Sequence, residues 1–292
     1  MSTIYGFKDL EVTNQHRIYP TIDPTTHFKK KTYKDKVVLV TGASRGIGRD
    51  VARYYALAGA SVAIVSRHQA ALEEVKAAIL QEVPGAKILV FAVDVKDFDA
   101  ANAAVNATVR QFGHLDILVA GAAAVTPAVG AQKIGEKDPL EWWNTFEVNV
   151  RGTFNFVRSA IPQLEQSQGY VVAVTAGSAH MIFPGSSDYC ISKQAVDRIV
   201  QFVVAEHPRV KALAFHPGLI ETELSRRFGI EFKRPDTTEL PAATLLHLTS
   251  GQADWLSGKY FSANWDLEEV EKKWKDKIIK EDALVSRLNT PS

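Results

Sequence analysis

Two side chains with complementary acid–base chemistry, Tyr189 and Lys193, stand four residues apart in the second half of the chain. Residues at this spacing lie on one face of a helix, so both side chains can reach a common pocket. A free tyrosine has a pKa of about 10 and exchanges protons poorly near neutral pH. A neighbouring ammonium group favours the phenolate and lowers that pKa. The pair therefore predicts a group that protonates a carbonyl or deprotonates an alcohol.

A glycine-rich loop lies far upstream of this pair, directly after the apolar run 37–40 and before a helical pattern. It reads Thr41-Gly42-Ala43-Ser44-Arg45-Gly46-Ile47-Gly48. In this context the first glycine permits a tight turn, and the other two let backbone and helix approach a pyrophosphate at the helix amino end. We therefore predict a dinucleotide site that includes Gly42, Ser44, Arg45, Gly46, Ile47 and Gly48. The spacing differs from the usual Gly-x-Gly-x-x-Gly, and no Gly-Lys-Ser/Thr ends the loop as in a P-loop.

The residues after the second expected strand distinguish two forms of the dinucleotide. An acid there would bond the ribose 2′-hydroxyl and favour NAD, but this chain has Ser66 and Arg67. Arg67 can pair with a 2′-phosphate, and Arg45 can supply a second charge. These residues predict NADP(H). Asp94, followed by Val95 at the tip of the third strand, is expected to bond the adenine amino group.

Alternating strands and helices must position these groups. Apolar runs that predict strands fall at 37–40, 60–65, 87–91, 115–119, 170–174, 210–215 and 259–261. Helical patterns fall between them, at 69–81, 100–112, 140–164 and 189–206. Continuous apolar runs are typical of parallel strands buried on both faces. The alternation therefore predicts an α/β fold with a parallel sheet and helices on both faces.

The two ends of the chain differ from this regular body. Residues 1–35 are rich in Pro, Thr, Lys and Asp, and we expect an extended arm with partial docking. Residues 36–292 are expected to form one domain, with a charged helical tail at about 266–288. The apolar residues of that tail fall on one stripe, which predicts packing on the body or on a partner subunit.

Composition narrows the function classes. The 292 residues carry a formal net charge of +1, which gives no argument for nucleic acid or an anionic membrane as a partner. The single cysteine, Cys190, cannot form an internal disulfide and favours a reducing compartment. No apolar run approaches the ~20 residues of a membrane span. No spaced Cys/His/Asp cluster predicts a metal site. We expect a soluble cytoplasmic protein.

Taken together, these motifs resemble the classical short-chain dehydrogenase/reductase family over roughly residues 36–261. Both ends of the chain look like fungal members of that family. The resemblance implies a single Rossmann-like domain with a doubly wound sheet of about seven strands. It also implies an NAD(P)-dependent oxidoreductase that forms a homodimer or homotetramer through the helices holding Asn149 and Tyr189.

The resemblance also implies roles for individual residues. Tyr189 would be the acid/base, and Lys193 would lower its pKa and bind the nicotinamide ribose. Asn149 would hold a water in a proton relay that reaches Lys193. The backbone of Ile220 and the hydroxyl of Thr222 would hold the nicotinamide carboxamide. The remaining implied cofactor contacts are Ala120, Gly121, Pro217 and Gly218.

Two positions depart from the family pattern. The run 120–123 reads Ala-Gly-Ala-Ala where the family has Asn-Asn-Ala-Gly, so the amides that brace the central sheet are missing. Ala176 stands where the family has the serine that bonds the substrate carbonyl. Because side chains alternate along a strand, Thr175 should face away from the pocket while Ser178 shares the lost serine's side. Ser178 is therefore a candidate catalytic donor; a water, the substrate's own donor, or Ser178 as a plain turn residue are the alternatives.

We expect an NADPH-dependent carbonyl reductase, or the reverse alcohol dehydrogenase, for a medium-sized lipophilic substrate such as a secondary metabolite. The expected apolar wall comprises Met181, Ile182, Phe183, Leu219, Leu224 and Phe228. The missing serine leaves open a non-redox isomerase, cyclase or dehydratase on the same scaffold. A catalytically silent NADP-binding regulator is a third alternative, against which the intact Asn149, Tyr189 and Lys193 argue.

Overall fold

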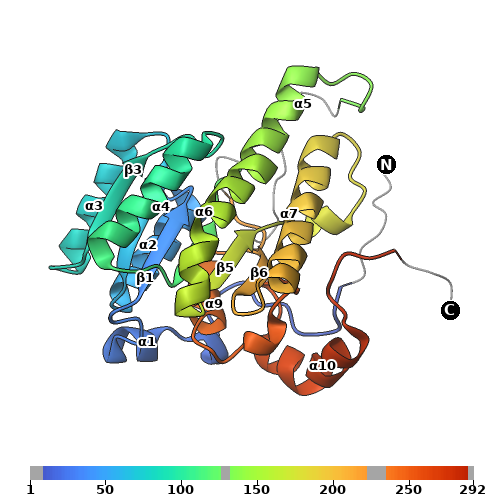
Figure 1. Cartoon of the computed structure of the whole chain (residues 1–292). Coiled ribbons are helices and arrows are strands. Elements are labelled where there is room, and N and C mark those ends of the chain that lie inside the picture. The colour runs from blue at the N-terminus through green and yellow to red at the C-terminus, as the bar shows by residue number, and fades with distance from the viewer. Residues whose placement is uncertain (1–8, 126–131, 222–234, 289–292) are drawn as a thin grey trace.

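The structure, a computed structural model, describes residues 9–125, 132–221 and 235–288. Within these ranges seven strands form one parallel sheet in the order β3-β2-β1-β4-β5-β6-β7 (Figure 1). The strands are β1 (Val37–Thr41), β2 (Ser61–Ser66), β3 (Ile88–Ala92), β4 (Ile117–Ala120), β5 (Tyr170–Val174), β6 (Lys211–His216) and β7 (Tyr260–Ser262). The strand order reverses between β1 and β4. In open α/β sheets, ligands bind at such a switch point, outside the carboxyl ends of the strands.

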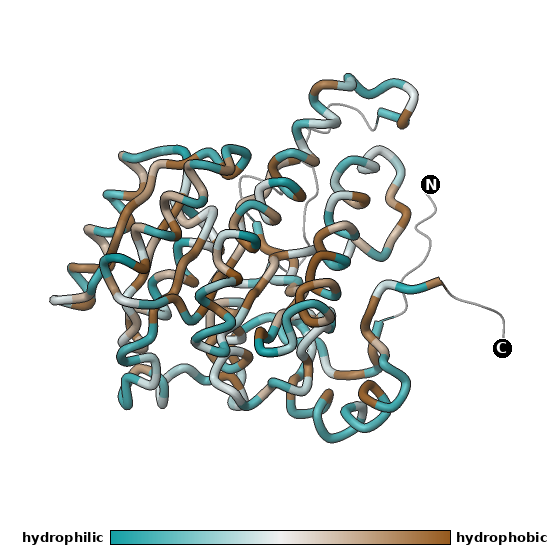
Figure 2. The backbone as a smooth tube through the Cα atoms, in the orientation of Figure 1, coloured by the Kyte–Doolittle hydropathy of each residue, from teal (hydrophilic) through white to brown (hydrophobic). Residues whose placement is uncertain are grey.

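The strands form where the sequence places continuous runs of Val, Ile and Leu. All five residues of β1 are buried, and in β2 only the first is partly exposed. The register aligns Leu39 with Ala63 on one side and with Leu118 on the other, so the centre of the sheet is entirely apolar. Figure 2 shows the hydrophobic residues concentrated in these central strands. The predicted parallel sheet with helices on both faces is confirmed.

Two layers of helices cover the sheet (Figure 1). One layer contains α2 (Gly46–Leu57), α3 (Gln69–Glu82) and α9 (Glu239–Leu248), with α2 packed on both of the others. The other contains α4 (Phe98–Phe112), α6 (Gly152–Ser167) and α7 (Ser187–Glu206). Helix α9 was not predicted from the sequence. Eight of its ten residues are buried, so it lacks the polar face that gives a surface helix its amphipathic pattern.

The expected long helix 140–164 is divided into two by a π-helical turn. Helix α5 (Pro139–Phe146) leads into the turn Glu147–Arg151, which continues into α6 without a break. The Asp138 side chain caps α5 by accepting bonds from the amides of Leu140 and Glu141, both at 2.9 Å. Single π-helical turns often occur at functional sites, and this one carries Asn149.

The N-terminal segment packs against residues near the C-terminal part of the chain, in α9 and at the start of α10 (Leu267–Glu281). It contains a 3-10 turn (Pro20–Ile22) and helix α1 (Thr25–Lys30). The Tyr19 hydroxyl donates to the Trp265 carbonyl at 3.1 Å and accepts from the Leu267 amide at 2.9 Å. The Tyr33 hydroxyl donates to the Leu246 carbonyl at 2.5 Å. These bonds fix the segment against α9 and against the start of α10.

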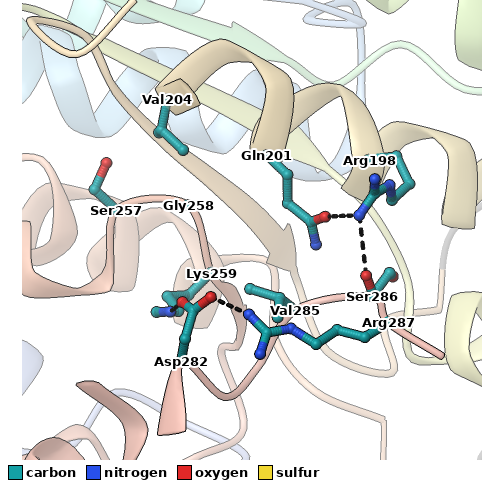
Figure 3. Close-up of a pocket in the computed structure, with 10 residues that line it drawn as sticks. All are labelled: Arg198, Gln201, Val204, Ser257, Gly258, Lys259, Asp282, Val285, Ser286 and Arg287. Carbon is teal, nitrogen blue, oxygen red and sulfur yellow. Dashed lines mark hydrogen bonds and ion pairs between the residues drawn. The ribbon is translucent and has the colours of Figure 1, made fainter. Parts of the chain in front are cut away.

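The C-terminal segment covers the outer edge of the sheet. Helix α10 buries Leu267, Val270 and Ile278, and the chain then returns to β7, where the Tyr260 amide donates to the Leu284 carbonyl at 2.8 Å. A pocket of 310 Å³ lies between this segment and α7 (Figure 3). Three of its charged side chains pair with one another, since Asp282 contacts both Lys259 and Arg287. Arg198 donates to the Gln201 side chain and to the Ser286 carbonyl. In the described ranges, no helix combines the length and the apolar composition needed to cross a membrane.

Candidate active site

Helix α7 carries the predicted acid–base pair. Tyr189 and Lys193 are one turn apart, and the Lys193 Nζ lies 5.7 Å from the centre of the Tyr189 ring. The Lys193 side chain is buried, and its amine donates a 2.8 Å hydrogen bond to the carbonyl of Val174, the last residue of β5. The Thr175 hydroxyl donates to the Lys193 carbonyl at 3.2 Å. The carboxyl end of β5 thus holds both the side chain and the backbone of this lysine.

The side chain of Asn149 joins the pair to the loop after β4. Its Oδ1 accepts from the Ala124 amide at 2.8 Å, and its Nδ2 donates to the Ala124 carbonyl and to the Ser192 hydroxyl, both at 3.0 Å. Ser192 in turn donates to the Tyr189 carbonyl at 2.8 Å. Because protein groups accept from both amide hydrogens, the Asn149 side chain braces the loop and α7 in this structure.

Burial governs the charge states of the pair. It lowers the pKa of the Lys193 amine to about 8, and the carboxylate of Asp197, one turn further along α7, partly opposes that fall. Burial also raises the pKa of the Tyr189 hydroxyl above its ordinary value, with a smaller contribution from Cys190. The sequence-based expectation was the opposite direction for tyrosine, drawn from the lysine alone. A tyrosine with this pKa is protonated at neutral pH and can act as a proton donor, but the raised pKa makes it a weaker acid than a free tyrosine.

The glycine loop packs backbone to backbone against the loop after β4. Gly42 has a φ of 73°, and a Cβ there would lie 2.9 Å from the Ala122 backbone. A Cβ on Gly48 would lie 2.4 Å from the Gly42 carbonyl oxygen. The Thr41 hydroxyl accepts from the amides of Gly121 and Ala122 at 3.0 and 3.2 Å. Thr41, which sequence analysis did not identify, therefore braces the sheet where the family's asparagines are missing.

Most of the predicted cofactor residues that the structure describes lie at the same side of the sheet. They stand at or just after the carboxyl ends of β1, β2, β3, β4 and β6, and the others, Tyr189 and Lys193, lie in α7. Ser66 is buried at the end of β2, and the next side chain, Arg67, is exposed. Asp94 accepts from the Lys96 amide at 3.0 Å, and Val95 packs against Gly152 of α6, where a Cβ would lie 2.5 Å from the valine side chain.

This arrangement fits a dinucleotide. The loops after β1 and β4 contain small residues and pack closely through their backbones. They lie at the amino end of α2, where a phosphate can bind. The exposed cationic side chain of Arg67 directly follows β2. When bound, such a cofactor supplies a hydride.

The Pro-Gly segment follows β6. Pro217 and Ile220 are buried, and Leu219 is 49% exposed. The Leu219 amide donates to the Asp236 Oδ2 at 2.6 Å, a contact that sequence analysis did not anticipate. Three predicted residues, Thr222, Leu224 and Phe228, lie outside the described ranges.

The two hydroxyls beside Ala176 differ in their surroundings. Thr175 is buried and bonded to the Lys193 backbone. Ser178 is half-buried in a 3-10 turn (Gly177–His180). Burial raises the pKa of the neighbouring Cys190 thiol, and a hydrogen bond with the Ser178 hydroxyl partly opposes that rise. Of these two hydroxyls, Ser178 is the one that backbone bonding does not occupy.

His216, the last residue of β6, should make the protein acid-sensitive. Burial lowers its pKa to about 4, a fall that Asp236 opposes and His180 reinforces. An unfolded histidine has a pKa near 6.5, so the unfolded chain binds more protons between these values, and stability falls as pH falls through that window. Between about pH 7.5 and pH 5 this group should remove about 2 kcal/mol from the free energy of unfolding. His216→Gln should lose correspondingly less in urea unfolding at the two pH values; an unchanged pH dependence would contradict the assignment.

Comparison with known proteins places this geometry in a family. Residues 36–231 match the family described as short chain dehydrogenase. Short chain dehydrogenase mpl6 of Monascus purpureus is 37% identical over 281 residues, which cover 92% of this chain and 93% of that protein. An Arabidopsis thaliana protein named 11-beta-hydroxysteroid dehydrogenase-like 3 is 33% identical over 199 residues, 67% of this chain and 62% of that protein. The crystal structure of a dehydrogenase/reductase from Sinorhizobium meliloti 1021 superposes with a TM-score of 0.72 at 25% identity, covering 82% of this chain and 97% of that one. The chain therefore belongs to the short-chain dehydrogenase/reductase family.

Proposed function

We propose that this protein is an NADPH-dependent oxidoreductase that interconverts a ketone and a secondary alcohol on a medium-sized lipophilic substrate. The observation that carries the proposal is the placement of the Tyr189 ring 5.7 Å from the buried amine of Lys193, at the carboxyl ends of the strands, where the glycine loop also lies. A hydride donor and a proton donor can act on one carbonyl group only if both lie at the same end of the strands.

The preference for NADPH rests on charge at the end of β2. Ser66 and Arg67 occupy the positions where an acid would favour NADH, and the Arg67 side chain is exposed to a ligand. Arg45, exposed in the loop before α2, provides a second guanidinium. Guanidinium groups bind phosphate oxygens through paired, charge-assisted hydrogen bonds, so two of them favour the 2′-phosphate.

In the reducing direction, the Tyr189 hydroxyl gives its proton to the substrate carbonyl oxygen as the carbonyl carbon receives the hydride. The oxygen becomes the hydroxyl of the product, and the phenolate that remains is stabilised by the Lys193 ammonium. Lys193 is held in place by the Val174 carbonyl, and Asn149 fixes the loop and helix around it. Proton uptake from solvent then restores the tyrosine.

A lipophilic substrate is supported by apolar side chains near the site. Ile182, just after the Ser178 turn, is 66% exposed, and Leu219 of the Pro-Gly segment is 49% exposed. The Arabidopsis relative is named 11-beta-hydroxysteroid dehydrogenase-like 3, and a hydroxysteroid is an apolar alcohol.

We also propose a homodimer or homotetramer that forms through α6 and α7, because these helices expose the apolar side chains of Phe154, Ile191 and Phe202. A cytoplasmic location stays a prediction.

One observation favours a second candidate, a non-redox isomerase, cyclase or dehydratase. Ala176 removes a hydrogen-bond donor that hydride transfer to a carbonyl ordinarily uses. Cofactor turnover separates the candidates. Net NADPH oxidation with substrate supports the reductase, and product formed without it supports the alternative.

Replacing Arg67 tests the choice of cofactor. Arg67→Asp should weaken NADPH binding by about tenfold to a hundredfold, the range for one charge-assisted contact, and should reverse the preference toward NADH. Titration of both cofactors into both proteins measures the effect. Equal affinity of the unaltered protein for the two cofactors would contradict the assignment.

Replacing Tyr189 tests the proton donor. Tyr189→Phe should lower turnover by about 10²–10⁴-fold, the usual contribution of a general acid, and should leave NADPH binding intact. Tyr170→Phe is a matched control, because the Tyr170 hydroxyl bonds Asp254 at 2.7 Å at the opposite end of β5. Retention of most activity in Tyr189→Phe would assign proton transfer to another group.

Replacing Ser178 tests the substitute for the missing serine. Ser178→Ala should lower turnover by about 10²-fold, and Ala176→Ser in that background should restore part of it. Ser167→Ala is the control, since that hydroxyl bonds the Leu115 carbonyl at 2.8 Å, far from the catalytic edge. If Ser178→Ala leaves kcat unchanged, water or the substrate itself supplies the donor.

A further inference from the structure

A buried carboxylate fixes the segment after β6. Asp236 Oδ2 accepts from the Leu219 amide at 2.6 Å, and the Asp236 amide returns a 3.0 Å bond to the Leu219 carbonyl. Gly218 has a φ of 100°, and a Cβ there would lie 2.6 Å from the same Oδ2. The carboxylate therefore lies directly against the Pro217–Ile220 turn and holds its backbone from one side.

The N-terminal segment reaches this carboxylate from across the sequence. His16 Nδ1 lies 2.6 Å from Asp236 Oδ1, although the two residues are 220 positions apart. Because a carboxylate only accepts, the imidazole N–H is the donor. Asn264 Nδ2, just after β7, donates to Asp236 Oδ2 at 2.9 Å and to the Gln15 carbonyl at 2.9 Å.

These donors account for the stability of the buried acid. The Asp236 side chain has no exposed surface, and a buried carboxylate is costly unless hydrogen bonds replace its hydration. His16, Asn264 and the Leu219 amide supply them. Removing the imidazole would take this donor from Oδ1, so the carboxylate would shift and carry the Leu219 amide with it.

His16 is itself held firmly, which allows it to position a partner. The Gln15 amide donates to the Asn264 carbonyl at 2.6 Å, and Asn14 forms an antiparallel bridge with Trp265. One turn into α10, Glu269 accepts from the Thr13 hydroxyl at 2.8 Å. Beyond His16, the Tyr19 hydroxyl donates to the Trp265 carbonyl at 3.1 Å, so the N-terminal segment is bonded on both sides of the residue that contacts Asp236.

We propose that His16 is a positioning residue of the cofactor site, which acts through Asp236 to hold the Pro217–Ile220 backbone in the shape that receives the nicotinamide end of the cofactor. This inference rests on the proposed function, because it assumes that the segment contacts the nicotinamide. It assigns a role in cofactor binding to the N-terminal segment, which lies outside the glycine loop and α7.

The test separates the two ends of the cofactor. NADPH carries the nicotinamide, whereas 2′-phospho-ADP-ribose keeps the adenosine half and lacks the nicotinamide ring. His16→Ala should weaken NADPH binding by about tenfold, the size of one hydrogen bond to a charged group. The same change should leave the affinity for 2′-phospho-ADP-ribose at the wild-type value, as measured by calorimetric titration. His16→Asn, which restores an N–H donor near the position of Nδ1, should recover most of the NADPH affinity.

His114 provides a matched control at the opposite end of the strands, just before β4 begins. His114 Nε2 lies 3.0 Å from Asp116 Oδ2, and its side chain is 43% exposed against 45% for His16. His114→Ala should therefore change thermal stability to a similar degree and leave both affinities unchanged. If His16→Ala does not fold, Asn264→Ala decides the question, because it removes another donor to the same carboxylate.

Equal loss of both ligands in His16→Ala, or no loss of either, would overturn the positioning role and leave His16 as a contact for stability only. Failure of His16→Asn to recover NADPH binding would also count against it. A wild-type protein that binds neither ligand would instead overturn the proposed function, and this inference with it.

Discussion

The amine of Lys193 lies inside the protein, where a positive charge costs free energy unless its surroundings compensate. The Val174 carbonyl accepts one of its hydrogens, and the Asp197 carboxylate one helical turn away favours the charged form. The Asp197 carboxylate is available because it belongs to the same helix, whereas the Val174 carbonyl is available because α7 packs against β5 and β6. The sheet order, the length of α7 and the end of β5 must therefore be correct together before the lysine can be buried beside Tyr189.

A second constraint is the close contact between the loops after β1 and β4. The two loops touch through backbone atoms, so a larger side chain at Gly42 would force them apart, and one at Gly48 would distort the glycine loop itself. Thr41 fixes the distance by accepting two amides of the opposite loop. Asn149 then connects the same loop, at Ala124, to Ser192 of α7. The cofactor edge and the catalytic helix are therefore one continuous hydrogen-bonded unit, assembled without the asparagine amides that the family usually places after β4.

The sequence carried local information well and contacts between distant segments poorly. The strands were predictable because their apolar runs are continuous, and the Tyr189–Lys193 pair because helical spacing fixes which residues share a face. Helix α9 was missed because a helix with eight of its ten residues buried has no polar face to reveal its period. The π-helical turn was missed because the apolar pattern continues through it. The raised pKa of Tyr189 depends on burial, which spacing does not report. Asp236 was missed because its partners come from both ends of the chain.

The pairing of the two chain ends has a consequence for biosynthesis. Residues 13–19 bond to 264–269, and those partners leave the ribosome long after the N-terminal segment does. Until then the N-terminal segment has no place to dock, and bringing such distant residues together carries a loop-closure cost that local contacts do not. A nascent chain could form most of the sheet while Asp236 still lacked two of its donors. Only molecules that extend through residues 264–269 can complete this corner of the fold, so translation that stops before them would release chains in which the buried Asp236 carboxylate lacks its Asn264 donor.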